Sequence, residues 1–305
     1  MQWFQKATNA LTALGIIVPM SNSSHMHPIP GMQGFASCGP ARALIVLASV
    51  LLLCLTACSR LEGGIGFGDK GNATRKIGLS EPYYDQSAFH VEGGRYRYDD
   101  GEAVAEQTGV DVSDHQGAID WDAVAADGIS FAFIRIGYRG NTEGGLYADA
   151  LFEANYAAAR DAGLACGTYF YSQATTIEEA QEEASFVLEL LADRPLAYPV
   201  AFDYEVVPNT RIANVDRRTV TRIGQTFCST IRAGGYEPMV YGNTFDLARF
   251  DDAWLAGCSI WCAEYDDGPS YERRTDVWQY SSQGHVSGID GFVDLNLDLS
   301  DVLVR

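Results

Sequence analysis

The chain has 305 residues, 47% of them hydrophobic, and a formal net charge of −19 at pH 7. This length allows one large domain or two small ones, and the hydrophobic content is ample for a packed core. The negative charge argues against binding to nucleic acid and against an electrostatic grip on anionic lipid, because both need clustered Lys and Arg.

The N-terminal region has the features of a secretion signal. An uncharged run of thirteen residues, 43–55, leads into Leu-Thr-Ala-Cys at 55–58. Such a run is too short to cross a hydrocarbon core of ~30 Å, but it fits the apolar region of a signal peptide. The Leu-Thr-Ala-Cys ending resembles the bacterial lipobox, which implies lipid attachment to Cys58 and removal of residues 1–57. A short membrane anchor with an incidental cysteine is the alternative.

The start of the chain has two interpretations. Met32 begins a more conventional signal peptide, so translation could start there, and a cytoplasmic extension ahead of the signal is the alternative. In both cases we expect an extracytoplasmic protein that is held at the bacterial cell membrane by its lipid only.

Four of the seven cysteines lie beyond Cys58: Cys166, Cys228, Cys258 and Cys262. In an oxidising compartment an even number allows two disulfides, with three possible pairings. Zinc is the weaker interpretation, because Cys258 and Cys262 lack a second close pair at ligand spacing. We therefore expect disulfides or buried thiols here, with no metal site and no cofactor.

Residues 58–107 show little periodicity and are rich in Gly, Tyr and charged residues. The glycines between positions 63 and 68 favour flexibility, so the segment is predicted to be a tether between the membrane and the domain. Its aromatic residues allow a second possibility, an arm that packs onto the domain: Tyr83, Tyr84, Phe89, Tyr96 and Tyr98.

Over residues 108–305 short apolar strands alternate with amphipathic helices. Strands are expected at Gly109–Val112, Phe131–Tyr138, Gly167–Tyr171, Tyr198–Phe202, Pro238–Tyr241, Ser259–Ala263, Val277–Tyr280 and Phe292–Leu295. Helices are expected at Ala148–Ala162, Ile177–Leu191 and Arg217–Ala233. Thr176 and Asp216 stand at N-cap positions of the last two helices. The alternation predicts an α/β fold, an irregular TIM-like (β/α) barrel whose last strands connect through loops. An open doubly wound sheet is the alternative.

Four acidic residues lie at or near the ends of predicted strands: Asp111, Asp203, Glu205 and Asp294. The first and last strands of a barrel are neighbours, so Asp111 and Asp294 can meet although 183 positions separate them. Asp203 and Glu205, at i and i+2, share one face of a strand, and their repulsion raises one pKa. One carboxyl then keeps a proton beside an ionised partner, as glycoside cleavage requires. A solvated strand end is the alternative interpretation.

Several segments in chain order resemble the motifs of family 25 glycoside hydrolases, the Chalaropsis-type lysozymes. These segments are Gly109–Trp121, Phe133–Tyr138, Gly167–Ser172, Asp203–Glu205, Trp278–Tyr280, Gly288–Gly291 and Val293–Asn296. The resemblance implies a β/α-barrel N-acetylmuramidase, which cleaves the β-1,4 bond between N-acetylmuramic acid and N-acetylglucosamine. It also implies that Glu205 is the proton donor, assisted by Asp203, with Asp111 and Asp294 on the floor of the cleft.

Aromatic and amide side chains near the strand ends are candidate sugar contacts: Tyr169, Tyr171, Tyr241, Trp261, Trp278, Gln279 and Asn296. Aromatic faces stack on sugar rings and amides bind hydroxyl or N-acetyl groups, but core packing and structural hydrogen bonds are equally good explanations. Arg135 stands in an apolar strand and is expected to pair with a barrel carboxylate, because an unpaired buried charge is costly. His115 could orient a carboxylate.

The sequence thus predicts an enzyme, a lysozyme that acts on the glycan strands of peptidoglycan. A non-catalytic cell-wall glycan-binding lipoprotein is one alternative, and a hydrolase of another aminosugar polymer, such as chitin, is a second. The presence of all four acids opposes the first alternative, because binding alone needs no proton donor. The second needs only different sugar contacts around the same carboxyls.

Overall fold

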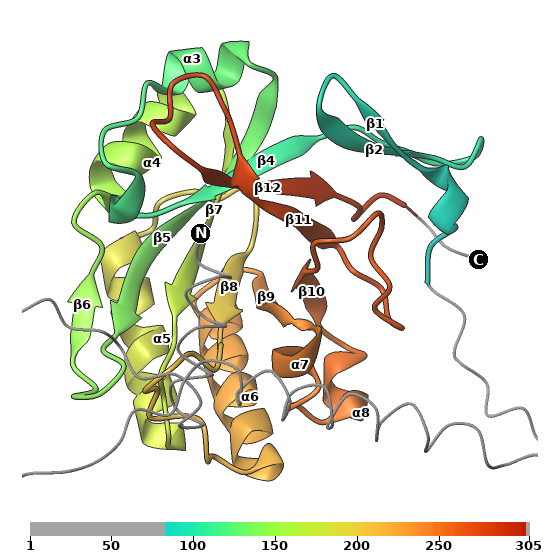
Figure 1. Ribbon diagram of the computed structural model, residues 1–305. Coiled ribbons are helices and arrows are strands. Elements are labelled where there is room, and N and C mark those ends of the chain that lie inside the picture. The colour runs from blue at the N-terminus through green and yellow to red at the C-terminus, as the bar shows by residue number, and fades with distance from the viewer. Residues whose placement is uncertain (1–82, 303–305) are drawn as a thin grey trace, which may run out of the picture. The chain divides into compact units, whose positions relative to one another are not determined.

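The computed structural model describes residues 83–302, and within them eight strands form a closed barrel (Figure 1). The strands are β4 (Thr108–Val112), β5 (Ile129–Arg139), β7 (Ala165–Tyr171), β8 (Val200–Asp203), β9 (Pro238–Asn243), β10 (Ser259–Ala263), β11 (Val277–Gly284) and β12 (Val293–Asp298). Their spatial order is β4-β12-β11-β10-β9-β8-β7-β5, and a parallel β4–β5 pairing closes the ring. The predicted barrel is therefore confirmed, and the open sheet is wrong because the first barrel strand pairs on both sides.

The last strand gives the barrel its irregularity. β12 runs antiparallel to both β11 and β4, whereas the other neighbouring strands of the ring are parallel. No helix lies between β10 and β11 or between β11 and β12, in agreement with the expected loop connections. The β12–β4 register places Asp294 directly opposite Asp111. The two ends of the domain thus meet at one pair of carboxyls.

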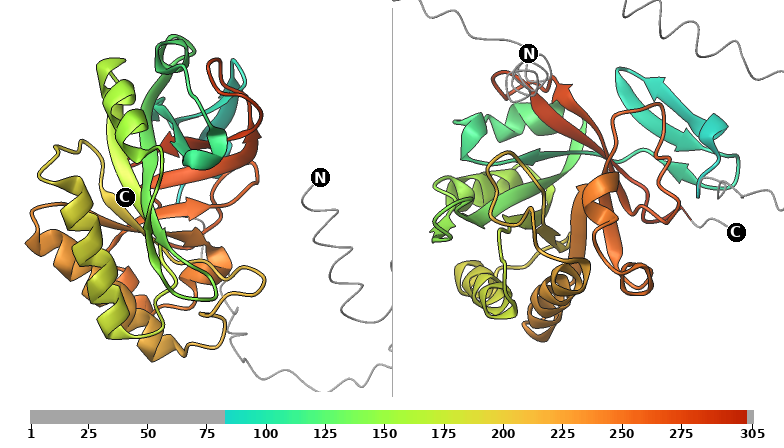
Figure 2. Two further views of the ribbon diagram at one scale, coloured as in Figure 1. Left: turned by 90° about the vertical axis from the view of Figure 1, so that its left-hand side faces the viewer. Right: turned by 60° about the horizontal axis from the view of Figure 1, so that its bottom comes forward.

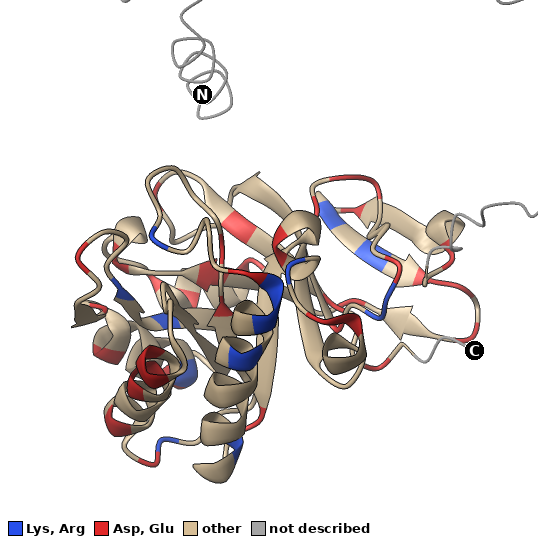
Figure 3. Ribbon diagram, turned by 90° about the horizontal axis from the view of Figure 1, so that it is seen from below, with Lys and Arg blue, Asp and Glu red and all other residues tan. Residues whose placement is uncertain are grey.

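The helices pack around the outside of the barrel: α3 (Trp121–Ala126), α4 (Phe152–Asp161), α5 (Ile177–Leu191), α6 (Arg217–Ala233), α7 (Thr244–Leu247) and α8 (Asp252–Leu255). The predicted bounds of α5 and α6 are confirmed, because Thr176 and Asp216 accept the expected N-cap hydrogen bonds from backbone N–H groups. α4 begins four residues later than predicted, at Phe152, because 146–148 form β6 (Leu146–Ala148), which pairs with the end of β5. α5 and α6 pack against each other, and the charged residues of α5 are all acidic whereas those of α6 are all arginines (Figure 3).

Alternation along the strands divides the apolar side chains into two cores. The core inside the barrel is mostly aromatic: Phe131, Phe133, Ala201, Met239, Tyr241, Trp261, Ala263 and Val277. The larger core lies between the strands and the helices. Space inside is tight at Gly109, where a Cβ atom would stand 2.2 Å from Phe131 Cε2, so a glycine is required there.

An N-terminal arm covers the side of the barrel where β11 has no helix (Figures 1 and 2). It consists of a 3-10 turn, η1 (Gln86–Ala88), and a three-stranded sheet of β1 (Phe89–Glu92), β2 (Arg95–Asp99) and β3 (Val104–Ala105). Phe89 and Tyr96 pack against Trp278, with ring centroids 5.2 and 4.8 Å apart. Over residues 83–105 the chain thus forms the arm and not the tether, whereas residues 1–57 and Cys58 lie outside the described residues.

Two further features concern membrane and cysteine chemistry. Among residues 83–302 no helix combines the length and the apolar character needed to cross a membrane. The four cysteines of the domain are free thiols, and Cys166, Cys228 and Cys262 are buried. Of the two expected states, disulfides or buried thiols, the structure contains thiols.

Candidate active site

The four predicted acids come together at one end of the barrel, where the parallel strands β4 and β8 end and the antiparallel β12 begins. Asp111 lies in β4, Asp294 lies opposite it in β12, Asp203 ends β8, and Glu205 follows two residues later. Asp203 lies close enough to Glu205 and Asp111 for their charges to raise its pKa, and Asp294 is affected in the same way by Asp111 and Glu205. The cluster therefore joins residues from three strands into one acidic site.

Asp111 is fixed by two amide side chains. Gln279 Nε2 and Asn296 Nδ2 donate to Asp111 Oδ2 at 2.9 and 2.8 Å. The amides are themselves oriented, because Trp261 Nε1 donates to Asn296 Oδ1 at 2.8 Å and Tyr241 Oη donates to Gln279 Oε1 at 3.0 Å. Two amide donors on one oxygen favour a carboxylate in a single orientation.

Asp294 is the protonated partner in a hydrogen bond with Asp111. Burial, the charge of Asp111 and a hydrogen bond with Asp111 raise the pKa of Asp294 to about 9. Burial also raises the pKa of Asp111, but hydrogen bonds from Asn296, Gln279 and Asp294 oppose this effect. At neutral pH the pair therefore carries one proton, which Asp294 donates to Asp111, and one negative charge.

Asp203 and Glu205 form the second pair. Burial raises the pKa of Asp203 well above its usual range, and the neighbouring charges of Glu205 and Asp111 raise it further. The side chains of Asp203 and Glu205 share a hydrogen bond, so one of the two carboxyls carries a proton. Asp203 is buried, whereas Glu205 is partly exposed. A ligand in the site therefore meets Glu205 first.

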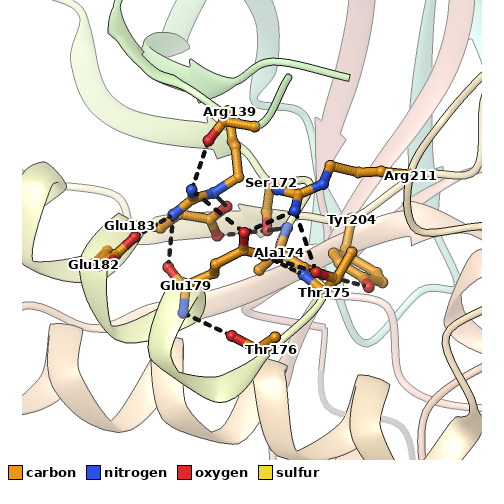
Figure 4. Close-up of polar contacts among 11 residues, drawn as sticks. Arg139, Ser172, Ala174, Thr175, Thr176, Glu179, Glu182, Glu183, Tyr204 and Arg211 are labelled. Atoms are coloured by element: carbon orange, nitrogen blue, oxygen red, sulfur yellow. Dashed lines mark hydrogen bonds and ion pairs between the residues drawn. The ribbon is translucent and has the colours of Figure 1, made fainter. Parts of the chain in front are cut away.

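The turn that carries this pair is supported by the chain that follows β7. Ser172 N donates to Asp203 O at 2.7 Å. Tyr204 Oη donates to Ala174 O at 2.9 Å (Figure 4). Tyr204 is fully buried, so this contact lies away from solvent. The two hydrogen bonds fix the chain at Asp203 and Tyr204, between the two carboxyl side chains.

A buried ion pair holds this supporting segment in turn. Glu183 of α5 accepts from Ser172 Oγ at 2.6 Å and from Arg139 Nε at 2.7 Å (Figure 4). Burial raises the pKa of Glu183 to about 7, although Ser172 and Arg139 oppose the shift. Arg139 also donates to Gly144 O at 2.7 Å and to Glu179 O at 3.0 Å. The acid pair is thus anchored to the outer helix through Ser172.

The predicted aromatic contacts separate into two groups. Tyr169 and Tyr171 are partly exposed, and the nearby charges of Asp203 and other acids of the cluster contribute to raising their pKa. Trp278 is not in the site: it lies on the opposite face of β11 from Gln279, because neighbouring strand residues alternate, and it packs under the arm.

The remaining predicted sugar contacts are mostly buried. Trp261, Gln279 and Asn296 are at most 1% exposed, and Tyr241 is 8% exposed. Their hydrogen bonds lead to Asp111 and not to an open surface. These side chains therefore orient a carboxylate, and a ligand touches them little.

Sequence reasoning missed two residues of the site. Tyr265 is 58% exposed as a whole residue, but its hydroxyl group donates to Gln279 Oε1 at 2.9 Å. Partial burial and the charges of Asp294 and Asp111 raise the pKa of this hydroxyl. Asp246 is buried and accepts from Val206 N at 3.1 Å, directly after Glu205. Both residues follow the end of a barrel strand, so the rule that identified the four acids would have found them as well.

Arg135 and His115 lie at the edge of the cluster. Arg135 forms ion pairs with Asp149 at 2.8 Å and with Asp114 at 2.6 Å, so its charge is paired as expected, although with neither Asp111 nor another acid of the cluster. His115 is largely exposed, and its Nδ1 lies 3.4 Å from Asp114 Oδ1. Among the described residues, no cluster of His, Cys, Asp and Glu is suited to hold a metal ion.

Comparison with known proteins agrees with this arrangement. The family model of glycosyl hydrolases family 25 matches residues 110–289. An autolytic lysozyme of Clostridium acetobutylicum is 27% identical over 197 residues, which are 64% of this chain and 57% of that protein. The uncharacterized protein YegX of Escherichia coli K12 is 31% identical over 205 residues, which are 62% of this chain and 68% of that protein.

A solved structure has the same fold. The modular autolysin LytC of Streptococcus pneumoniae, in complex with a synthetic peptidoglycan ligand, matches with a TM-score of 0.58 at 23% identity. The match covers 69% of this chain and 52% of that chain, so the present chain spans little more than half the length of LytC and of the Clostridium lysozyme. With the family match extending over 110–289 and with the barrel described above, the chain belongs to the glycosyl hydrolases of family 25.

Proposed function

We propose that the barrel is a muramidase, which hydrolyses the β-1,4 bond between N-acetylmuramic acid and N-acetylglucosamine in peptidoglycan. The observation that carries the proposal is the Asp203–Glu205 pair, which keeps one proton and exposes only Glu205. Support for the substrate comes from the autolytic lysozyme among the relatives and from the peptidoglycan ligand in the LytC structure.

The proposal gives each pair of carboxyls a role. The proton of the pair passes from Asp203 to Glu205 along their hydrogen bond, and Glu205 gives it to the leaving glycosidic oxygen, because Glu205 is the member of the pair that a ligand can reach. Both carboxyls of that pair are then ionised while the sugar carbon carries positive charge, and their charges stabilise that carbon. The Asp111–Asp294 pair adds one fixed negative charge. A water molecule completes the reaction: its oxygen bonds to the sugar carbon and its released proton returns to the Asp203–Glu205 pair.

The test compares the full-length protein with its Glu205→Gln variant on purified peptidoglycan. The products are reduced with borohydride and their new ends are identified by mass spectrometry. We expect reduced muramic acid ends from the wild type and none from the variant. The matched control is Glu237→Gln, an exposed glutamate directly before β9 and thus at the other end of the barrel, which should cleave like the wild type.

Other outcomes distinguish the alternatives. Reduced glucosamine ends would support a peptidoglycan hydrolase, but one that cleaves the other glycosidic bond of the strand. Cleavage of chitin oligosaccharides in place of peptidoglycan would favour a different aminosugar polymer. Absence of new ends from a folded wild type that still binds the glycan would support a non-catalytic binding protein.

We also propose that the domain works on the outer side of a bacterial membrane, attached through a lipid on Cys58. The support is the apolar run at 43–55 followed by Leu-Thr-Ala-Cys. Incorporation of a labelled fatty acid into the chain in cells tests this proposal.

A further inference from the structure

An open pocket of about 610 Å³ lies between the arm and the rim of the barrel. Its walls include Arg95 and Tyr96 from β2, Tyr265 from the loop after β10, and Tyr280 from β11. The volume is within the ~300–1,000 Å³ range of small-ligand sites. The arm precedes residues 110–289, which the family model matches, so the arm's side of this pocket lies outside the matched region.

The pocket meets the acid cluster at Tyr265. The hydroxyl of Tyr265 donates to Gln279, the same amide that donates to Asp111. The side chain of Tyr265 also forms part of the pocket wall. A polymer bound at the acid cluster that extends across Tyr265 therefore reaches the pocket directly.

The walls suit an uncharged ring with an apolar face. Val91 of the arm and Tyr265 of the barrel are 59% and 58% exposed, so each wall presents one large uncovered apolar side chain. Aromatic and aliphatic side chains of this kind cover the C–H face of a sugar ring. Asp266 and Asp267 in the wall make the pocket unfavourable for a carboxylate of a peptide stem.

Arg95 gives the pocket a rigid polar edge. Its Nη2 donates to Asp127 at 2.9 Å and to His285 O at 3.2 Å, which neutralises the charge and fixes the guanidinium. Its Nε is buried without a hydrogen-bond partner. Tyr96 Oη donates to Asp267 at 3.3 Å, so the arm and the barrel loop are bonded across the pocket.

We propose that the arm and the rim form an additional saccharide subsite, which binds an uncharged aminosugar unit of the peptidoglycan strand beyond the bond that is cleaved. This proposal rests on the proposed function, since it takes the glycan in the acid cluster as the same strand. The subsite makes long strands bind more tightly than short fragments that fill only the acid cluster.

The test uses Val91→Glu in the full-length protein, because this residue is exposed and does not contact the acid cluster. The new carboxylate places charge where the apolar sugar face would lie. Val104→Glu is the matched control: Val104 is also an exposed valine of the arm, 55% exposed, and it does not line the pocket. KM and kcat are measured on muramic acid oligosaccharides of two defined lengths, one short and one long.

We expect Val91→Glu to raise KM for the long oligosaccharide by about tenfold, which corresponds to the loss of one favourable contact. KM for the short oligosaccharide should be unchanged. Val104→Glu should behave like the wild type on both. An equal effect of Val91→Glu on both lengths, or no effect on the long one, would overturn the subsite.

Equilibrium binding separates this proposal from the proposed function. If the wild type cleaves neither oligosaccharide, the muramidase proposal fails, but the affinities of the same proteins for the two lengths still test the subsite. A selective loss of long-strand affinity in Val91→Glu supports it, and equal affinities for wild type and variant overturn it.

Discussion

Replacing Asp294 by Asn tests whether this carboxyl is protonated in the folded protein. Its pKa is raised from 3.8 to about 9, chiefly by burial and by Asp111. A carboxyl with a raised pKa contributes stability that is fully present below its unfolded pKa and is lost as pH rises through the folded value. The wild type should therefore lose stability between about pH 4 and pH 9 through this group, whereas an asparagine has no such loss.

The magnitude follows from the width of that window. Each pH unit inside it costs the wild type at most ~1.4 kcal/mol relative to the variant, so the difference between pH 5 and pH 8 is at most about 4 kcal/mol. Asp294 is partly exposed and shares its proton with Asp111, so we expect about half of that, roughly 2 kcal/mol.

The assay is urea unfolding followed by tryptophan fluorescence at pH 5, 6.5 and 8. Asp290→Asn, at an exposed aspartate in the loop before β12, is the control and should follow the wild type at each pH. A constant difference between Asp294→Asn and the wild type across this range would refute the reasoning, because Asp294 would then be ionised throughout. On activity, Asp294→Asn should lower kcat less than Asp294→Leu, because only asparagine still donates to Asp111.

Two further predictions concern the turn and the membrane. Tyr204→Phe removes the hydrogen bond to Ala174 O and leaves that buried carbonyl unpaired, so it should cost about 1–3 kcal/mol in urea unfolding and lower kcat more than it raises KM, since Glu205 is less well positioned. An unchanged kcat would contradict this role of the turn. Cys58→Ala should abolish the fatty acid label and move the protein from the membrane to the soluble fraction; a label that persists would exclude Cys58 as the lipid site.

The sequence predicted those parts of the fold that local chemistry decides. Thr176 and Asp216 cap α5 and α6 where expected, because an N-cap acts on backbone groups only two or three residues away. The strand-end rule also located Asp111, Asp203 and Glu205, since barrel geometry brings the carboxyl ends of parallel strands to one face. Asp294 reaches the same face from the start of β12, because this strand runs antiparallel. Their placement is confirmed, and their catalytic roles remain predictions.

What the sequence could not provide depends on contacts between distant segments. α4 begins later than predicted because residues 146–148 pair with β5. The helical periodicity of the sequence carries no information about this pairing. Trp278 looked like a sugar contact, but the arm, some 180 residues earlier in the chain, covers it. Asn296 and Gln279 were predicted as sugar contacts, whereas in the folded structure both amides are buried and donate to Asp111.

The pairing of β12 with β4 has a consequence for the timing of activity. These strands are the last and the first of the barrel, so the contact between them closes a loop of nearly the whole domain and needs both ends of that loop to be present. Asp111 emerges early in synthesis but gains Asp294 and Asn296 only when the C-terminal strand is available. A chain whose synthesis has not reached residues 293–298 therefore lacks Asp294 and Asn296, and its acid cluster is incomplete.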